Sequence, residues 1–468
     1  MDSATLVNKN THLPVRAPER RSGPRLAVLD GLRLVAALMV VSFHYIGLGE
    51  AWHRPLPHGF PLPVFWASEY GFLGVELFFL ISGFVICMSS LGRGLGDFFI
   101  ARVCRLYPAY WFAVLATTVV VTALPHVRKP LDLKDTITNL SMLQLPLHVG
   151  DVDGVYWTLW AELRFYLIFA IVVAMGVTYK RVVAFCALWT VAAVAATAAG
   201  GALLQEIFMP AQAPFFIAGV AFFLIHRYGQ NAMLWGIIGL QFILGVHFLG
   251  VDIRIKNKFG HVPAWFAIVL IAVFFTVMAL IALGKLNFGW RWLTFAGTLT
   301  YPLYLLHQHI GWALMDKLQY HASPPVVVAV VLPLMLMLAW LVNRFVERPL
   351  ARLMRGVLRS AVGPNARPAH GLDAHGLNAH GLDARGSLSG NLTDPADNGS
   401  RVRQRAAGPA SQLDSFVRPH AHTPVRASDI PSAMSPAPSP ASPAVMTRDS
   451  MAEPASTYDR AAETNASA

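Results

Sequence analysis

The chain has 468 residues, of which 55% are hydrophobic and 13% are charged. A soluble domain carries about 25% charged residues, so this composition excludes an ordinary soluble enzyme and indicates an integral membrane protein. The net charge is +11, but the basic residues lie in short loops and tails, without the aromatic-interleaved basic surface of a nucleic-acid binder. We therefore predict no nucleic-acid partner. The three cysteines, Cys87, Cys104 and Cys186, have no spacing typical of a disulfide framework or a metal site, and neither is predicted.

Ten apolar runs approach the length of about 20 residues that a membrane-spanning helix requires. They lie at residues 28–48, 71–90, 107–124, 155–176, 181–201, 207–226, 231–250, 262–284, 295–315 and 324–345. The first run follows a polar segment and contains charges, which favours a retained helix over a cleaved signal peptide. We predict an all-α, polytopic integral membrane bundle of about ten transmembrane helices.

The distribution of basic residues predicts how this bundle is oriented. With ten spans, both termini lie on one side of the membrane. That side carries about twice as many lysines and arginines as the other side. Both tails are therefore expected in the cytoplasm. Residues 1–25 are predicted to be a polar tail and residues 26–350 the transmembrane domain. Residues 351–468, rich in Ala, Pro, Ser and Gly, are predicted to be a disordered, low-complexity tail.

The first apolar run, LDGLRLVAALMVVSFHY, contains three residues that are costly in a membrane, namely Asp30, Arg33 and His44. An arginine near the bilayer centre costs about 2.5–3.5 kcal/mol on insertion scales, so it is usually paired or functional. Arg33 and His44 are eleven residues apart, which on an α-helix places them on one face at about 16 Å along the axis. This face would hold a fixed cation near one membrane surface and a titratable imidazole deeper in the bilayer.

Further polar residues interrupt the later runs. Glu76 and Glu162 are buried carboxylates that either pair with a cation or work as an acid or base, and for Glu76 we favour pairing. Arg102 and Arg105 are spaced i, i+3 and form one cationic patch on a helix. This patch is either a topology anchor or a clamp for a polyanionic ligand, because paired guanidinium groups suit phosphates.

The run at 295–315 contains a polar stripe. Thr300, Tyr304 and His307 fall at i, i+4 and i+7, which is one side of a helix. Packing and function are both open for this stripe. Pro302 is expected to kink the helix, and Pro349 is expected to end the last helix after Glu347 and Arg348.

These stretches together resemble the acyltransferase type 3 family of polytopic membrane O-acyltransferases. The matching segments are LDGLRLVAALMVVSFH, GVELFFLISGFVI, ARVCRLYPAYW, WTLWAELRFYL, LTYPLYLLH and VERPL, in family order. The resemblance implies that His44 is the family's essential histidine and that Arg33, Arg102 and Arg105 act on the donor side. The resemblance also implies that Glu162 is the carboxylate of the WTLWAELRFYL motif. It places Glu76 where the family usually has an acidic residue. The remaining motif residues are Asp30, Ser82, Trp157, Tyr166, Tyr301, Tyr304 and His307.

Proteins of this kind move an acyl group, usually acetyl from acetyl-CoA, onto a hydroxyl of a carbohydrate or similar acceptor. The resemblance implies a bacterial inner (plasma) membrane location, no bound cofactor, and acetyl-CoA as a donor substrate. The acceptor is left open among an exopolysaccharide, an O-antigen sugar, a peptidoglycan sugar, a glycolipid and a secondary metabolite.

The residues fit this chemistry, because acyl transfer to a hydroxyl needs a base or an acyl-accepting nucleophile, and imidazole suits both roles. We expect His44 to deprotonate the acceptor, oriented by Glu162 or Glu76, with a covalent acyl-His44 relay as the variant. The competing class is a non-enzymatic transporter or flippase for an amphiphilic glycoconjugate, in which buried charges are equally common. Consumption of acetyl-CoA separates the two classes.

Overall fold

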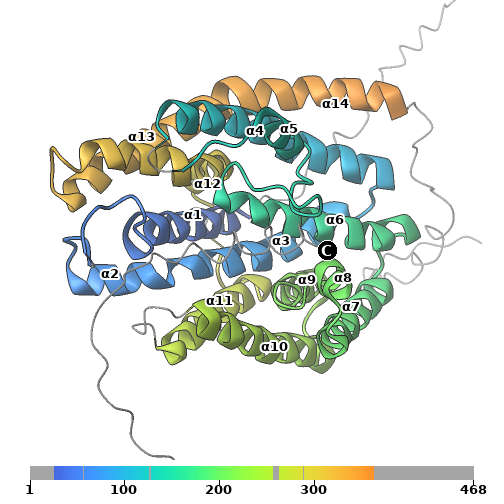
Figure 1. Cartoon of the computed structure of the whole chain (residues 1–468). Helices are drawn as coiled ribbons and strands as arrows, with labels where there is room; N and C mark the ends of the chain where they lie inside the picture. Colours follow the sequence, from blue (N-terminus) through green and yellow to red (C-terminus); the bar gives the residue numbers. More distant parts are fainter. Residues whose placement is uncertain (1–25, 56, 126–127, 257–262, 288, 363–468) are drawn as a thin grey trace, which may run out of the picture. The chain divides into compact units, whose positions relative to one another are not determined.

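A computed structural model describes residues 26–55, 57–125, 128–256, 263–287 and 289–362, and the expected tail at 1–25 lies outside this part of the chain. In the described residues the chain is almost entirely helical and contains no strand, which confirms the all-α prediction (Figure 1). The first elements are α1 (Ala27–Ser42), η1 (Phe43–Gly47), α2 (Leu62–Glu69), η2 (Tyr70–Leu73), α3 (Gly74–Ser90), α4 (Leu95–Ala123) and α5 (Leu133–Asn139). The next are η3 (Gly154–Tyr156), α6 (Trp157–Met175), α7 (Tyr179–Ala199), α8 (Ala202–Phe208), α9 (Ala213–Tyr228) and α10 (Ala232–Lys256). The last are α11 (Ala264–Ala282), α12 (Arg291–Leu318), α13 (Pro324–Val342), η4 (Asn343–Glu347) and α14 (Arg348–Val362).

Each of the ten predicted runs lies mainly in a helix, although the run at 207–226 is divided between α8 and α9. Nine segments of the described chain are long and apolar enough to cross a membrane. The remaining run, at 295–315, forms α12, which is too polar to count among these nine segments. Its polar side chains are nevertheless buried, including Thr300, His307, Gln308 and His309. The bundle itself therefore surrounds α12 with protein, and this compensates for its low hydropathy.

The helices approach one another most closely where glycines face backbone atoms. An added Cβ at Gly219 of α9 would lie 2.0 Å from the Leu80 carbonyl oxygen, and one at Gly83 of α3 would lie 2.1 Å from that of Phe216. Only glycine fits at these two crossing points, as in other membrane helix pairs joined by small residues. As a result α9 is buried along almost its whole length, between α3, α7, α10 and α11.

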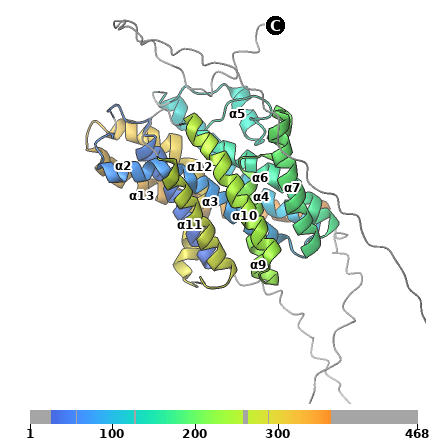
Figure 2. The same ribbon diagram turned by 90° about the horizontal axis from the view of Figure 1, so that it is seen from below.

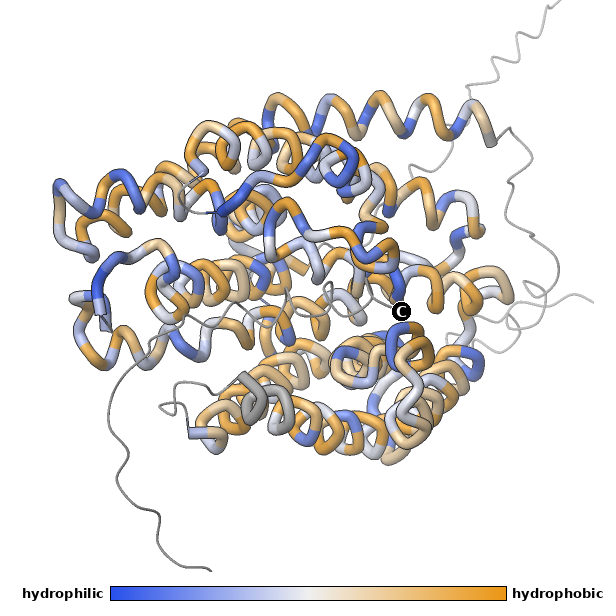
Figure 3. Tube along the Cα trace, viewed as in Figure 1, coloured by the Kyte–Doolittle hydropathy of each residue, from blue (hydrophilic) through white to orange (hydrophobic). Residues whose placement is uncertain are grey.

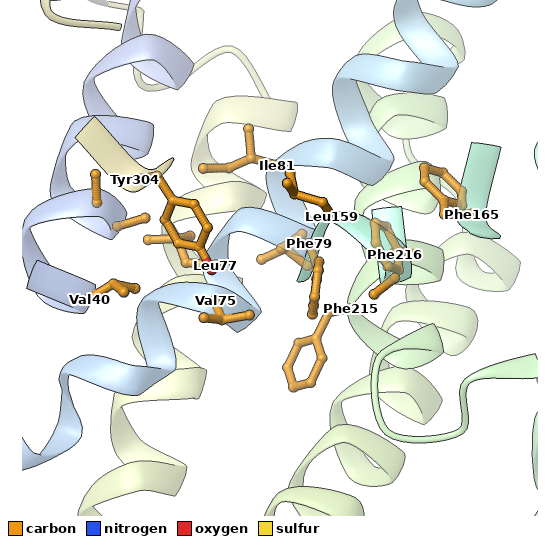
Figure 4. Close-up of a cluster of buried hydrophobic side chains, with 14 of the residues drawn as sticks. Val40, Val75, Leu77, Phe79, Ile81, Leu159, Phe165, Phe215, Phe216 and Tyr304 are labelled. Carbon is orange, nitrogen blue, oxygen red and sulfur yellow. The ribbon is translucent and has the colours of Figure 1, made fainter. Parts of the chain in front are cut away.

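Aromatic side chains fill the space beside this crossing. The ring of Phe216 lies 4.7 Å from that of Phe79 and 4.4 Å from that of Phe165, so α3, α6 and α9 share one apolar core (Figure 4). The outward faces are also largely apolar (Figure 3), as expected for helices that face lipid. Figure 2 shows α10 and α11 side by side on the outside of α9.

The end of the last span differs from the prediction. Pro349 does not stop the helix, because α13, η4 and α14 follow one another without a break and the π-helical turn η4 lies directly before the proline. A π-helical turn, η4, joins α13 to α14, and the helix then continues to Val362. Residues 351–362, predicted as part of the disordered tail, are therefore helical. The rest of that predicted tail lies outside the described residues.

Candidate active site

A pocket of about 800 Å³ opens between α1, α3, α4, α6 and α12. The predicted site residues that line it are Arg33, Ser82, Arg102, Arg105, Glu162, Tyr166, Tyr301 and Tyr304. Its other walls are mainly apolar, formed by Val75, Phe78, Phe79, Val85, Ile86, Leu106 and Leu159, with Thr158 and Thr300. Five helices that are distant in sequence thus place three guanidinium groups, a carboxylate and three phenols around one space.

The three arginines are held by different partners. Arg33 forms a 3.4 Å ion pair with Asp30, one turn earlier on α1. Arg102 donates a 2.5 Å hydrogen bond to Ser89 Oγ, and its guanidinium lies 5.7 Å from the Tyr166 ring centre. These contacts orient each guanidinium while leaving it beside the pocket.

Arg105 is fixed by a partner that the sequence did not reveal. Its Nη1 lies 2.5 Å from Glu347 Oε1 of η4, and its guanidinium lies 5.1 Å from the Tyr301 ring centre. Asn343 donates a 2.9 Å bond to the other oxygen of Glu347. The VERPL segment that carries Glu347 was part of the family resemblance, but spacing alone could not show which arginine it meets.

Glu162 meets hydroxyl groups at the pocket wall. Its Oε1 accepts a 2.5 Å hydrogen bond from Tyr166 OH and a 3.3 Å bond from Ser82 Oγ. Glu162 and Tyr166 are four residues apart on α6, so their side chains lie on one face of this helix. The carboxylate is thereby directed toward the pocket and anchored from both α6 and α3.

The tyrosines of α12 attach this helix to its neighbours. Tyr301 OH donates a 2.9 Å hydrogen bond to the Leu106 carbonyl of α4. The Tyr304 hydroxyl lies 2.9 Å from Thr158 Oγ1 of α6, and Thr158 in turn donates to the Val155 carbonyl. Buried hydroxyls are thus satisfied within the bundle, and the rings form part of the pocket lining.

His44 and His307 form a pair beyond the pocket wall. Nε2 of His307 lies 3.2 Å from Nδ1 of His44, and the ring centres are 5.0 Å apart. Nδ1 of His44 also lies 2.8 Å from the Val40 carbonyl, and Nδ1 of His307 lies 2.8 Å from the Tyr304 carbonyl. Carbonyl oxygens only accept, so both Nδ1 atoms carry hydrogen in the neutral rings. It follows that His307 accepts from His44, and that Nε2 of His44 keeps its lone pair.

His44 lies in a π-helical turn, η1, that continues α1, and such turns are frequent at functional sites. The turn is tied to α12, because Trp312 Nε1 donates a 2.9 Å bond to the His44 carbonyl and Tyr45 OH donates a 2.9 Å bond to the His307 carbonyl. Tyr45 can reach α12 because its ring lies against Gly311. The pocket and His44 are therefore linked through Tyr304 and His307, whose rings are 5.8 Å apart.

The pocket lining does not include the other predicted residues, Asp30, Glu76, Trp157, His44 and His307. Asp30 packs against Gly297 of α12 and pairs with Arg33. Glu76 lies in the first turn of α3, and Trp157 packs edge-on against Phe79. The side chain of His44 forms hydrogen bonds with the Val40 carbonyl and with His307, whereas Glu162 accepts hydrogen bonds from Tyr166 and Ser82.

Sequence reasoning missed a second polar cluster, which lies beside His309 of α12. The buried Asp153 accepts a 3.1 Å hydrogen bond from the His309 backbone N–H, and His309 Nδ1 donates a 2.9 Å bond to the Val152 carbonyl. Asp151 accepts a 2.7 Å bond from Gln144, and burial raises the pKa of Asp151 to about 6. The available signal was the pair of aspartates just before the run at 155–176.

Comparisons with known proteins agree with this architecture. A family model described as "Acyltransferase domain" matches residues 26–344. The chain is 32% identical over 98 residues to "Putative peptidoglycan O-acetyltransferase YrhL" of Bacillus subtilis, covering 19% of this chain and 13% of that protein. It is 31% identical over 173 residues to "Nodulation protein 10" of Rhizobium leguminosarum bv. viciae, covering 32% of this chain and 45% of that protein. Each match thus spans less than half of the relative's length, and no solved structure matches significantly.

The family match covers well over half of the chain and includes all five helices that line the pocket. The nine apolar helices of the described chain agree with an integral membrane location. This chain therefore belongs to the acyltransferase type 3 family, and its apolar helices are those of an integral membrane protein.

Proposed function

We propose that this protein is a membrane O-acyltransferase that moves an acyl group, in the first place acetyl, from acyl-CoA to a hydroxyl of a carbohydrate or glycoconjugate. The observation that carries the proposal is the pocket that combines Arg33, Arg102 and Arg105 with apolar walls and leads through α12 to the His44–His307 pair. The printed name of the Bacillus relative, a peptidoglycan O-acetyltransferase, supports both the acetyl group and the sugar acceptor.

The pocket suits the two ends of a CoA thioester. Guanidinium groups bind phosphate oxygens through charge-assisted hydrogen bonds. The apolar wall formed by α3, α4 and α6 would receive the pantetheine arm and the acyl group, which carry few charges. The arginines of the pocket are on the side that we propose to be cytoplasmic, where acyl-CoA is available. Both termini are proposed to lie on that side of the plasma (inner) membrane.

His44 is the proposed base. Its Nε2 takes the proton of the acceptor hydroxyl while the hydroxyl oxygen attacks the thioester carbonyl. The C–S bond then breaks, the ester is released, and the CoA thiolate takes the proton back from His44. Through His44 Nδ1, His307 holds the ring in this tautomer, so we assign the orienting role to His307 in place of Glu162 or Glu76. Glu162 remains a candidate site residue at the pocket wall.

Two variants of this proposal differ in testable ways. In a covalent relay, Nε2 of His44 would take the acyl group first and pass it to the hydroxyl. A transporter or flippase for an amphiphilic glycoconjugate would also use a polar pocket among membrane helices. Direct transfer and the covalent relay both consume acyl-CoA, whereas a transporter does not.

The test uses membrane vesicles of both orientations, supplied with acetyl-labelled acetyl-CoA and native envelope as the acceptor. Free CoA and label in the carbohydrate and lipid fractions are measured for the wild type, His44→Ala and the control His321→Ala, an exposed histidine between α12 and α13. We expect release from inside-out vesicles of the wild type and the control, and its loss in His44→Ala. Full release by His44→Ala at equal abundance would contradict the assigned role of His44. No release from the wild type would favour another donor or the transporter.

A further inference from the structure

The helix α14 carries four arginines on one side. Arg348, Arg352, Arg355 and Arg359 are spaced i, i+4, i+7 and i+11, which places them along one stripe. Apolar residues occupy the opposite side, including Leu353 and Val357. This helix lies beyond residue 344, where the family match ends.

The structure brings α14 next to the helix that supplies the pocket arginines. Figure 1 shows α14 following α13 and lying beside α4, and the two helices are in contact. The ion pair between Arg105 of α4 and Glu347, the residue immediately before α14, fixes this arrangement at 2.5 Å. The arginine stripe is therefore held near the end of α4 that carries Arg102.

A third element contributes to the same charge cluster. Arg93 lies exposed in the turn between α3 and α4. Partial burial lowers the pKa of Arg93, and the positive charges of Arg102, Arg355 and Arg359 lower it further, whereas Asp97 acts in the opposite direction. The guanidinium groups of Arg102, Arg355 and Arg359 thus lie within electrostatic range of Arg93. One of them, Arg102, also lines the pocket.

Like charges gathered at one place repel, and their cost is offset when a polyanion binds between them. We propose that Arg93, Arg355 and Arg359, together with Arg102, form a phosphate-binding cluster at the pocket mouth that holds the nucleotide phosphates of the acyl-CoA donor. This inference rests on the proposed function. The diphosphate of the donor is assigned to the arginines that line the pocket. The ribose phosphate is assigned to Arg355 and Arg359.

Anionic lipid headgroups offer the same phosphate chemistry. The donor is the assigned ligand because the cluster is continuous with the pocket through Arg102, whereas a lipid site would need no such connection.

The experiment measures kcat and KM of the purified full chain in nanodiscs of zwitterionic lipid, with acetyl-CoA and with acetyl-dephospho-CoA, which lacks the ribose phosphate. The variants are Arg93→Gln and the double variant Arg355→Gln/Arg359→Gln. The control is Arg227→Gln, an exposed arginine at the end of α9. We expect the double variant to raise KM for acetyl-CoA about tenfold with little change in kcat, as expected for lost charge-assisted hydrogen bonds. KM for acetyl-dephospho-CoA should hardly change, and the control should match the wild type.

The outcomes separate this inference from the function on which it rests. If the wild type consumes acetyl-CoA and the double variant has the same KM, the phosphate-binding cluster is wrong and the acyltransferase proposal stands. If the variant loses activity only when anionic lipid is added to the nanodiscs, the cluster binds lipid and the inference is overturned. If the wild type consumes no acetyl-CoA, both proposals fail.

Discussion

Nε2 of His307 lies 3.2 Å from Nδ1 of His44, and each ring also uses its Nδ1 to meet a carbonyl oxygen of its own helix. This relationship makes His307 an acceptor that holds His44 in one tautomer and stabilises the charge that the ring gains when it takes a proton. A positioning residue of this kind has a measurable signature that differs from that of a packing residue.

We predict that His307→Phe lowers kcat about 100-fold, near the lower end of the usual contribution of acid–base groups, while KM for the donor changes little. His307→Gln keeps an acceptor atom and should recover part of the lost rate. Steady-state kinetics of both variants, with the pH–rate profile of each, checks this. If Phe and Gln reduce the rate equally with an unchanged pH profile, His307 only fills space.

The Arg105–Glu347 pair should matter more than a surface pair. The Glu347 side chain is 8% exposed, and its loss leaves Arg105 without its carboxylate beside the Tyr301 ring. Glu347→Gln is therefore expected to cost about 1–3 kcal/mol of stability and to raise KM for the donor.

The matched control for Glu347→Gln is Glu206→Gln. Glu206 is 50% exposed and pairs with Arg164 at 3.0 Å, so its removal should cost less than about 1 kcal/mol. Thermal unfolding in detergent compares the two. An equal loss of thermal stability in both variants would argue against a special role for Glu347.

The two hydroxyl groups that bind Glu162 should not be equivalent. Tyr166 donates at 2.5 Å and Ser82 at 3.3 Å, so the tyrosine makes the stronger charge-assisted bond. We expect Tyr166→Phe to lower kcat/KM about tenfold and Ser82→Ala about twofold, because the shorter of two hydrogen bonds to the same carboxylate is the stronger one. A larger loss of kcat/KM in Ser82→Ala than in Tyr166→Phe would mean that Glu162 is positioned mainly by the hydroxyl from α3.

Asp151 gives a pH dependence of stability. Its pKa is raised by burial from 3.8 to about 6, so between these values the folded state binds a proton that the unfolded state has lost. Stability therefore falls as pH rises from about 4 to about 6 and stays lower above that, by about 3 kcal/mol.

Asp151→Asn removes this pH-dependent loss and keeps an oxygen for the Gln144 amide. Its melting temperature should exceed that of the wild type at pH 7.5 and differ little at pH 5. Burial also raises the pKa of Glu50, so a smaller slope of the same sign should remain. A variant that is less stable than the wild type at pH 7.5 would contradict the prediction.

The sequence predicted the helices well because hydropathy is a local property, and each of the ten runs lies mainly in a helix. The order of motifs named Arg33, Arg102, Arg105 and Glu162 as candidate site residues, and the structure shows that all four line one pocket. Helical spacing shows which residues share a face, but it does not show which helix that face meets.

The contacts that were not predicted are therefore those between distant segments. Glu347 with Arg105, Asp153 with His309, and His44 with His307 all depend on how the helices pack. The extrapolation from Arg33 to His44 assumed one regular helix, whereas the chain changes to i→i+5 bonding at Phe43, whose carbonyl accepts from the Leu48 N–H.

The polarity of α12 has a consequence for how the protein is made. A helix with buried histidines, glutamine and threonines inserts poorly by itself, because lipid cannot satisfy its polar groups. When α12 leaves the ribosome, α1, α4 and α6 have already been synthesised, and they present the partners that its tyrosines, histidines and glycines require. The candidate active site is thus completed late in biosynthesis, when the earlier helices provide the protein surroundings into which α12 inserts.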